Sequence, residues 1–223
     1  MVAAVALLAI FITVAKRAKV VPGRGQLAVE YVLRFVRVSV AEEILGKEHA
    51  KKYTPLLTTV FCAILAFNLT GVIPGLNLAG TSLIGLPVLL ALWMYVTYLS
   101  AGFRAHGFWG FLRTSLFPPG VPFFIYVLLT PVEALTVFIL RPATLAIRLM
   151  ANMVAGHLML ALTLSATQFF VFEASAALKG FGALTLLGGF VMTPFEMFIA
   201  GLQAYIFVVL SAVYINMSVE SEH

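Results

Sequence analysis

Arg148 is the residue of this sequence whose type and position most strongly indicate chemistry. It lies in the apolar segment Leu145–Met153, and the next charged residue downstream is Glu173. An arginine at the centre of a bilayer costs at least about 2.5–3.5 kcal/mol, so an embedded arginine indicates a functional site. Its guanidinium keeps its proton at accessible pH, so we expect a fixed positive charge that keeps an opposing carboxylate ionised. The alternatives are a structural ion pair or a side chain that reaches interfacial water. For Arg141, which precedes Pro142, a side chain that reaches interfacial water is as well supported as a functional role.

The helix face around Arg148 carries mainly small and polar side chains. At about 100° per residue, the residues within about 60° of Arg148 on a helix include Thr144, Ala151, Asn152, Ala155 and Met159. Ala151 and Ala155 form a small-xxx-small pattern, which lets a second helix approach closely. We therefore expect this face to contact a neighbouring helix, either in a partner subunit or within this chain.

His157 and Glu196 are further titratable residues inside the apolar C-terminal half. If residues 140–171 and 181–215 form antiparallel helices, the two side chains lie at the same depth, because they are nearly symmetric about the polar turn 173–180. Histidine exchanges protons near neutral pH, so the pair suggests a proton route. The alternative for His157 is a hydrogen-bonded histidine of the protein core.

Gln203 lies level with Arg148 in the same antiparallel pairing. Glu196, Gln203 and Tyr214 are separated by 7 and 11 residues, so they share one helix face. The two helices therefore offer a polar, titratable face and a fixed cation. This arrangement predicts a proton route that enters from outside past His157 and Glu196 and stops at Arg148.

The chain lacks a complete ion cycle. A proton route that ends at a cation needs a mobile acid, and the only other embedded acid is Glu133, beside Pro131 on the cytoplasmic side. The sequence has no phosphate-binding loop of the form G-x-x-x-x-G-K-[ST] and no Cys/His cluster with metal-ligand spacing. We therefore predict no cofactor and no metal, and we expect the missing acid and the energy source in other subunits.

The composition places these residues in a membrane protein. Apolar residues make up 62% of the 223 residues and charged residues 10%, against usual values of about 45–50% and about 25%. These values exclude a soluble enzyme, a disordered tail and a disulfide-stapled secreted domain. The net charge of +5 does not indicate nucleic-acid binding, because nine of the 14 Lys and Arg lie between Lys16 and Lys52, beside an apolar span.

The apolar runs predict an all-α, polytopic protein with about five transmembrane helices. The predicted organisation is a first transmembrane helix, an amphipathic helix at the cytoplasmic interface, two transmembrane helices, and a C-terminal helix hairpin that carries the proton path, over residues 1–15, 25–50, 55–103 and 121–217 respectively. The first run is short for a bilayer of about 30 Å, so we expect this span to begin upstream of Met1. Residues 121–171 are long enough for two spans, and this alternative stays open.

The amphipathic segment 25–50 has two different sides. Its apolar residues recur at helical spacing and its charged residues lie opposite, as expected of a helix at a membrane surface, with Leu27, Tyr31, Phe35 and Val38 on one side and Glu30, Arg34 and Arg37 on the other. The alternative is an ordinary loop helix in solution. The loops 16–52 and 101–120 carry nine and two Lys/Arg, and the loops 74–82 and 173–180 carry none and one. The positive-inside rule therefore predicts an outside N-terminus and a cytoplasmic C-terminus.

Three motifs resemble a known family. They run from Arg141 to His157 (RPATLAIRLMANMVAGH), from Gly201 to Leu210 (GLQAYIFVVL) and from Phe67 to Gly75 (FNLTGVIPG). Together they strongly resemble subunit a of the F-type ATP synthase, over roughly residues 20–220. The resemblance implies a non-catalytic subunit of the Fo sector with a long, strongly tilted C-terminal hairpin. It also implies partners: a ring of c subunits, b-type peripheral stalk subunits and the rest of the F1Fo complex, in a bacterial plasma membrane.

The resemblance also implies roles for the residues above. Arg148 would face the carboxylate of the rotating c-ring, and Asn152 and Gln203 would be its polar neighbours. His157 and Glu196 would line the outer half-channel, in the exchanged order that some members show. Two further roles complete the set: a position near the inner exit for Glu133 and a supporting polar role for Tyr214.

Two other functions are consistent with the composition. A stand-alone secondary transporter usually shows internal repeats, and the sequence contains none. An integral-membrane enzyme needs a convergent acid/base or metal cluster, for which only His157 and Glu196 qualify.

Overall fold

The computed structural model describes residues 9, 11–13, 16, 23–72, 84–116, 123–175 and 178–219. The described residues form helices and contain no strand, as the sequence predicts. In chain order the elements are α2 (Arg24–Val36), the π-helix η1 (Arg37–Glu42), α3 (Glu43–Val72), α4 (Gly85–Leu116), α5 (Phe123–Leu135), η3 (Thr136–Leu140), α6 (Arg141–Gln168), η4 (Phe169–Glu173) and α7 (Lys179–Val219).

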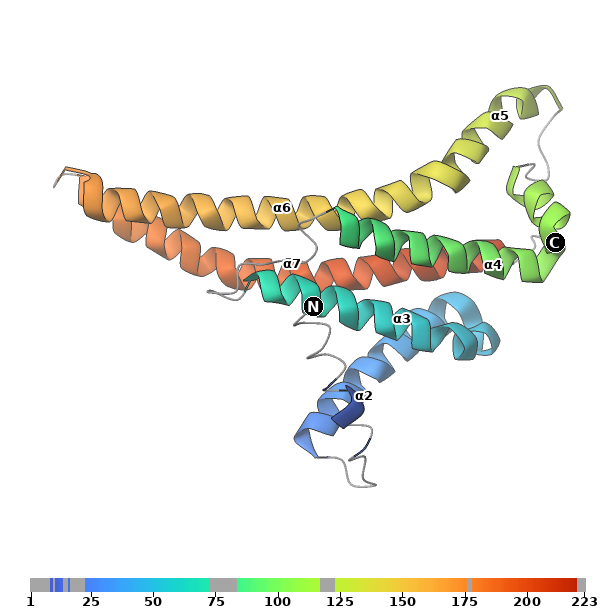
Figure 1. Ribbon diagram of the computed structural model, residues 1–223, viewed down its shortest axis with the longest axis horizontal. Helices are drawn as coiled ribbons and strands as arrows, with labels where there is room; N and C mark the ends of the chain where they lie inside the picture. The colour runs from blue at the N-terminus through green and yellow to red at the C-terminus, as the bar shows by residue number, and fades with distance from the viewer. Residues whose placement is uncertain are drawn as a thin grey trace.

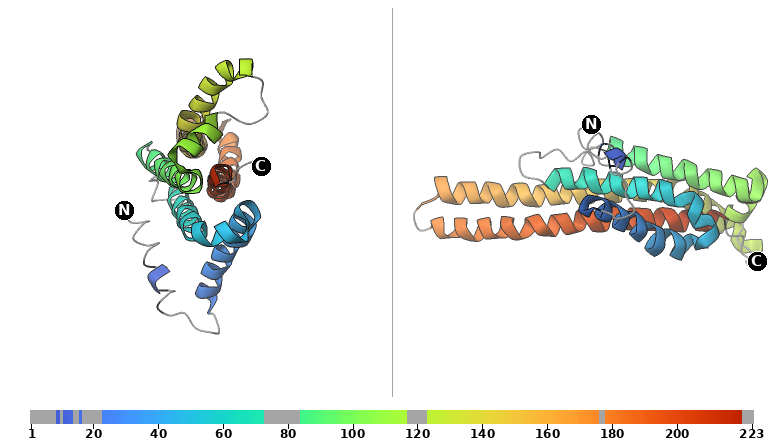
Figure 2. Two further views of the ribbon diagram at one scale, coloured as in Figure 1. Left: turned by 90° about the vertical axis from the view of Figure 1, so that its right-hand side faces the viewer. Right: turned by 90° about the horizontal axis from the view of Figure 1, so that it is seen from below.

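Within the described part of the chain, four helical stretches are long and apolar enough to cross a membrane. They cover Gly25–Val72, Gly85–Arg113, Leu128–Glu173 and Lys179–Val219, and they include the four predicted spans that follow residue 50. Most of the predicted first span, 1–15, lies outside the described residues. The stretches lie side by side over much of their length (Figures 1 and 2).

The apolar run 121–171 forms one helical stretch over its described part, so the alternative of two separate spans is wrong there. α5, η3, α6 and η4 follow each other without a break, and α5 turns away from the line of α6 (Figure 1). A proline ring removes one backbone hydrogen bond and clashes with the carbonyl four residues earlier. The π-turn η3 ends just before Arg141, so it includes the residue four positions before Pro142. The wider turn therefore accommodates the proline ring, and the helix bends at this point instead of ending.

The predicted amphipathic helix 25–50 is divided at Gly46. This residue has φ 70° and ψ 165°, a backbone conformation that glycine adopts without steric cost. α2 and η1 therefore run one way, and α3 returns beside them (Figure 1). Leu27 and Tyr31 are exposed, whereas Phe35 packs against Phe61 of α3 and Tyr205 of α7, with ring centres 6.2 and 5.8 Å apart.

The core lies where α3, α4 and α6 surround the C-terminal half of α7. One side of α7 carries mainly small residues at helical spacing, which lets the neighbouring helices approach closely: Ala200, Ala204, Val208, Ala212 and Ile215. Leu57, Val60 and Ile64 are fully buried residues of α3 in the same core.

α6 and α7 form the predicted antiparallel hairpin. Asn152 is bonded to Gln203, and Thr167 to Thr185. Both pairs are nearly symmetric about residues 176–178, so the predicted register is confirmed. The half of the hairpin nearest its turn extends beyond α3 and α4 (Figure 2, right). Many of its outward side chains are large and apolar, and they include Leu158, Leu162, Phe172, Leu187, Phe190 and Phe198.

Candidate functional site: the α6–α7 hairpin

Arg148 lies on the open side of α6. Leu145, Leu149 and Met153 point into the core, whereas Arg148 is exposed. The five residues predicted to share its face are exposed too, so no described helix of this chain covers that face. The one ion pair among the described residues joins Arg37 and Glu42. Arg148 is thus a cation in an apolar span, and no carboxylate among the described residues pairs with it.

Asn152 and Gln203 tie the two helices together one turn from Arg148. Asn152 Nδ2 donates a hydrogen bond of 2.6 Å to Gln203 Oε1. Gln203 is 2% exposed, and its Nε2 has no acceptor among the described residues. The amide bridge therefore fixes α7 against α6 beside the cation and leaves one buried donor available.

Glu196 is a buried carboxylate packed against Gly156. It is 6% exposed, and neither carboxylate oxygen has a hydrogen-bond donor within the described part of the chain. A Cβ at position 156 would lie 2.5 Å from Glu196 Oε1, so the carboxylate occupies the space that the glycine leaves. Burying a polar group without a partner is costly, so this carboxylate is suited to taking up a proton or binding water.

His157 lies next to this contact. Its Nε2 is buried and, among described residues, unpartnered. The structure brings Glu196 to the level of His157, as the register predicts, but no hydrogen bond joins the two side chains. Of the five buried side-chain atoms without a partner in the described chain, four belong to Glu196, His157 and Gln203. Unpartnered buried polar atoms are rare in folded proteins, so their concentration in this hairpin indicates a functional site.

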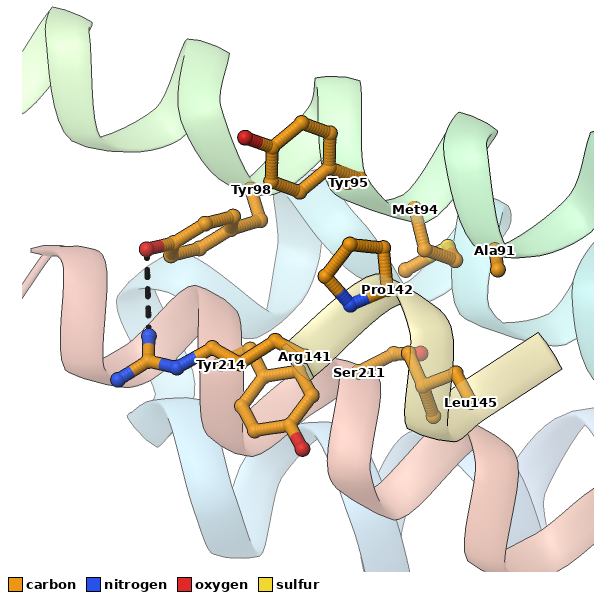
Figure 3. A pocket seen from close by; sticks show the side chains of 9 residues that line it. All are labelled: Ala91, Met94, Tyr95, Tyr98, Arg141, Pro142, Leu145, Ser211 and Tyr214. Carbon is orange, nitrogen blue, oxygen red and sulfur yellow. Dashed lines mark hydrogen bonds between the residues drawn. The ribbon is translucent and has the colours of Figure 1, made fainter. Parts of the chain in front are cut away.

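Arg141 is held between two tyrosine rings. Its guanidinium carbon lies 5.6 Å from the ring centre of Tyr98 in α4 and 5.3 Å from that of Tyr214 in α7. Its Nη1 donates a hydrogen bond of 3.2 Å to Tyr98 Oη (Figure 3). The rings and Ser211 also line a cavity of about 10 Å³, about the size of one water molecule. Arg141 therefore joins α4, α6 and α7 and does not simply reach for interfacial water.

Comparison with known proteins decides the family. Residues 1–216 match the family model described as ATP synthase A chain. The chain belongs to this family.

Curated relatives agree over more than nine tenths of the chain. It is 42% identical over 217 residues to "ATP synthase subunit a" of Rhodococcus erythropolis, which covers 97% of this chain and 79% of that protein. Proteins of the same name from Nocardioides sp. and Arthrobacter sp. are 38% and 35% identical, over 99% and 93% of this chain and 80% and 77% of theirs. A chain of the ATP synthase A chain family with four described spans is a multi-pass membrane protein.

Glu133 is not brought to the group around Arg148. It is half-buried in α5, on the other side of the η3 bend, and it forms no ion pair with a described residue. Fifteen residues of helix separate it from Arg148, which is roughly 22 Å along the axis. The structure therefore leaves Glu133 as a separate group at the α5 end of this ATP synthase A chain.

Tyr98 is a site residue that the sequence analysis did not find. Besides the bond from Arg141, its backbone oxygen accepts a 3.3 Å hydrogen bond from Ser218 Oγ at the end of α7. A tyrosine in an apolar span is an ordinary core or interface residue, so its type alone carries no signal. An embedded arginine without a nearby acid requires a partner, and that requirement is the signal that could have directed attention to aromatic rings at the same depth.

Proposed function

We propose that this chain is the proton-translocating stator subunit of the Fo sector of an ATP synthase. It provides two offset half-channels to the carboxylates of a rotating c-ring, and Arg148 separates them. The observation that carries the proposal is the position of Arg148, which is exposed within an apolar span and has no carboxylate partner among the described residues. An ion left there needs a partner from outside the chain, because an unpaired charge at membrane depth is costly.

The open face of α6 supports a moving partner. The small side chains of Ala151 and Ala155 permit a helix to pass close to Arg148. A ring carboxylate that arrives at Arg148 is kept ionised by the opposite charge. A ring carboxyl group can move into lipid at much smaller cost when it is protonated than when it is charged. Because Arg148 keeps the carboxylate in front of it charged, a proton cannot pass directly from one half-channel to the other.

Glu196 and His157 form the outer half-channel in this proposal. Their unpartnered atoms accept a proton from the outer aqueous phase and pass it toward the ring. Glu196 is seven residues from Gln203, or roughly 10 Å along α7, and Gln203 is bonded to Asn152 beside the Arg148 face. The protonated ring site then rotates through lipid and releases its proton on the inner side.

Glu133 lies toward the inner exit, and the stator position requires attachment to b-type stalk subunits and to the rest of F1Fo. The proposed orientation has the N-terminus outside and the C-terminus in the cytoplasm, since the basic segment 16–52 then faces the cytoplasm. Rotation of the ring drives ATP synthesis in the catalytic sector, so this chain holds no catalytic site of its own.

The test is Arg148→Ala in the whole complex, reconstituted in vesicles and driven by an imposed proton gradient. We expect assembly at normal yield and loss of ATP synthesis by at least about 100-fold, because the charge that separates the half-channels is removed. Arg104→Ala, at an exposed arginine of α4, is the matched control and keeps synthesis. Synthesis at the parental rate in the assembled Arg148→Ala complex would remove Arg148 from the mechanism.

A further inference from the structure

A basic pocket lies between the α2–η1 arm and the beginning of α3. Its volume is about 770 Å³, within the range of about 300–1,000 Å³ that is usual for small-ligand sites. Its lining combines cations with apolar and hydroxyl side chains, and includes Leu33, Arg34, Arg37, Lys51, Thr54 and Pro55. The proton route does not use any of these residues.

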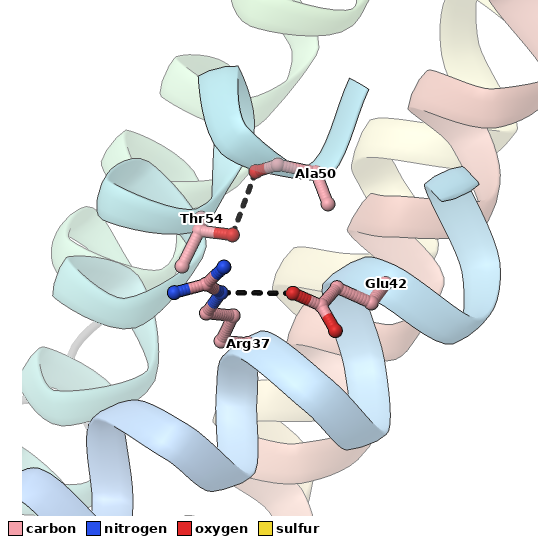
Figure 4. Close-up of polar contacts among 4 residues, drawn as sticks. All are labelled: Arg37, Glu42, Ala50 and Thr54. Atoms are coloured by element: carbon pink, nitrogen blue, oxygen red, sulfur yellow. Dashed lines mark hydrogen bonds and ion pairs between the residues drawn. The ribbon is translucent and has the colours of Figure 1, made fainter. Parts of the chain in front are cut away.

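The charges of the basic pocket are only partly neutralised. Arg37 Nε lies 2.8 Å from Glu42 Oε1 (Figure 4). A guanidinium has five N–H donors, so the donors on the two Nη atoms of Arg37 remain. Arg34 and Lys51 are exposed, and no hydrogen bond or ion pair joins their side chains to another described residue. Three cations against one carboxylate leave a positive site for an anion.

The polarity of the basic pocket changes along α3. On the α3 side the lining begins at Lys51, and Pro55 and Thr58 lie roughly 6 and 10 Å further along the helix axis, toward the apolar part of the span. The hydroxyl of Thr54 is bonded to Ala50 O of its own helix (Figure 4), so it adds little polarity. Leu33 of α2 is 38% exposed on the opposite side. The pocket therefore offers cations beside apolar walls.

We propose that the basic pocket binds the headgroup and the first acyl carbons of an anionic phospholipid. The phosphate contacts Arg34, Arg37 and Lys51, and the chains follow Leu33 and Pro55 into the bilayer. Free phosphate would satisfy the cations but would leave the apolar walls in water. The bound lipid then fills the angle that the Gly46 turn opens between α2 and α3, and fixes the amphipathic arm to the membrane surface.

The test places a photoreactive residue in the basic pocket of the whole ATP synthase complex. Leu33→p-benzoylphenylalanine is reconstituted in vesicles of equal parts phosphatidylglycerol and phosphatidylcholine, irradiated, and its lipid adducts are identified by mass spectrometry. We expect adducts of phosphatidylglycerol to exceed those of phosphatidylcholine by at least about fivefold, since each basic side chain near a surface favours an anionic lipid by about that factor. The same probe at Leu27, which is exposed on α2 outside the pocket, gives a ratio near one.

Charge-removing variants separate this site from general attraction. Arg34→Gln/Lys51→Gln lowers the adduct ratio at least fivefold, whereas Arg104→Gln/Arg113→Gln, with the same charge change elsewhere, leaves it unchanged. If the first variant does not assemble, raised salt on the unaltered pocket lowers the ratio instead, because salt screens exposed charges. Equal adducts of both lipids, adducts to a polypeptide, or a ratio abolished by millimolar inorganic phosphate would overturn the proposal.

Discussion

Gly156→Ala tests whether the position of the Glu196 carboxylate matters for proton uptake. The added Cβ would lie 2.5 Å from Oε1, 3.0 Å from Cδ and 3.2 Å from Cγ of Glu196. Non-bonded heavy atoms are comfortable at about 3.5 Å or more, so the carboxylate must move by about 1 Å. It is the end of a flexible side chain, so it can rotate away without separation of α6 and α7.

The variant is expected to lose function without losing stability. Replacing a glycine by alanine inside a helix stabilises the folded state by roughly 0.5–1 kcal/mol. This gain offsets the cost of rotating the carboxylate, so the thermal midpoint of the complex stays the same or rises. A misplacement of about 1 Å in a reacting group can slow a reaction by up to about 100-fold. We expect the initial rate of ATP synthesis, driven by an acid–base jump in vesicles, to fall by about tenfold or more.

Two further variants make the result decisive. Gly201→Ala is the matched control, because no atom lies within 4 Å of the Cβ that it adds to α7. In the Gly156→Ala background, Glu196→Asp shortens the acid and restores part of the rate. Parental synthesis by an assembled Gly156→Ala complex would refute the argument, and equal losses in both alanine variants would attribute the effect to helix stiffness.

Two contacts outside the Glu196 site give further predictions. Asn152→Ala lowers the free energy of unfolding by about 1–2 kcal/mol, because it leaves the buried Gln203 amide unpaired. The double variant with Gln203→Ala loses less than the sum of the two single variants. Unfolding in mixed micelles measures these losses, and strictly additive losses would contradict the hydrogen bond between the two side chains. Tyr98→Phe removes only the hydrogen bond from Arg141 and costs about 1 kcal/mol, whereas Tyr98→Leu also removes a cation–π contact worth about 0.5–2 kcal/mol more; equal thermal midpoints for the two variants would show that the ring does not hold Arg141.

Features that depend on periodicity along one helix pair could be predicted from the sequence. The polar turn at 173–180 and the matching depths of polar residues fixed the hairpin register, and the Asn152–Gln203 bond confirms it. The exposure of Thr144, Asn152 and Ala155 beside Arg148 followed from helical spacing. In both cases the relevant separation is a few residues along one helix or a symmetric pairing across one turn.

Features that depend on packing between distant helices could not be predicted in this way. Gly46 stands in a segment with helical periodicity, and only the return of α3 beside α2 requires its positive φ. Tyr98 meets Arg141 across 43 residues of sequence, and no local pattern encodes that distance. The sequence analysis predicted Tyr31 and Phe35 on the same apolar face, but only Phe35 packs against aromatic rings. The reason is that the neighbouring helix contacts only the C-terminal end of α2.

The unsupported half of the hairpin has a consequence for local stability. Among the described residues, α6 and α7 are packed only against each other near their turn, whereas further from the turn they are packed against α3 and α4 (Figure 2). In the chain without its partners, backbone amides near residues 165–190 therefore exchange with solvent deuterium sooner than those near 200–215, because local opening requires less free energy where fewer apolar contacts break. When neighbouring subunits bind the hairpin, its amides near the turn are expected to exchange as slowly as those near 200–215. Slow exchange near the turn therefore indicates that the neighbouring subunits are bound.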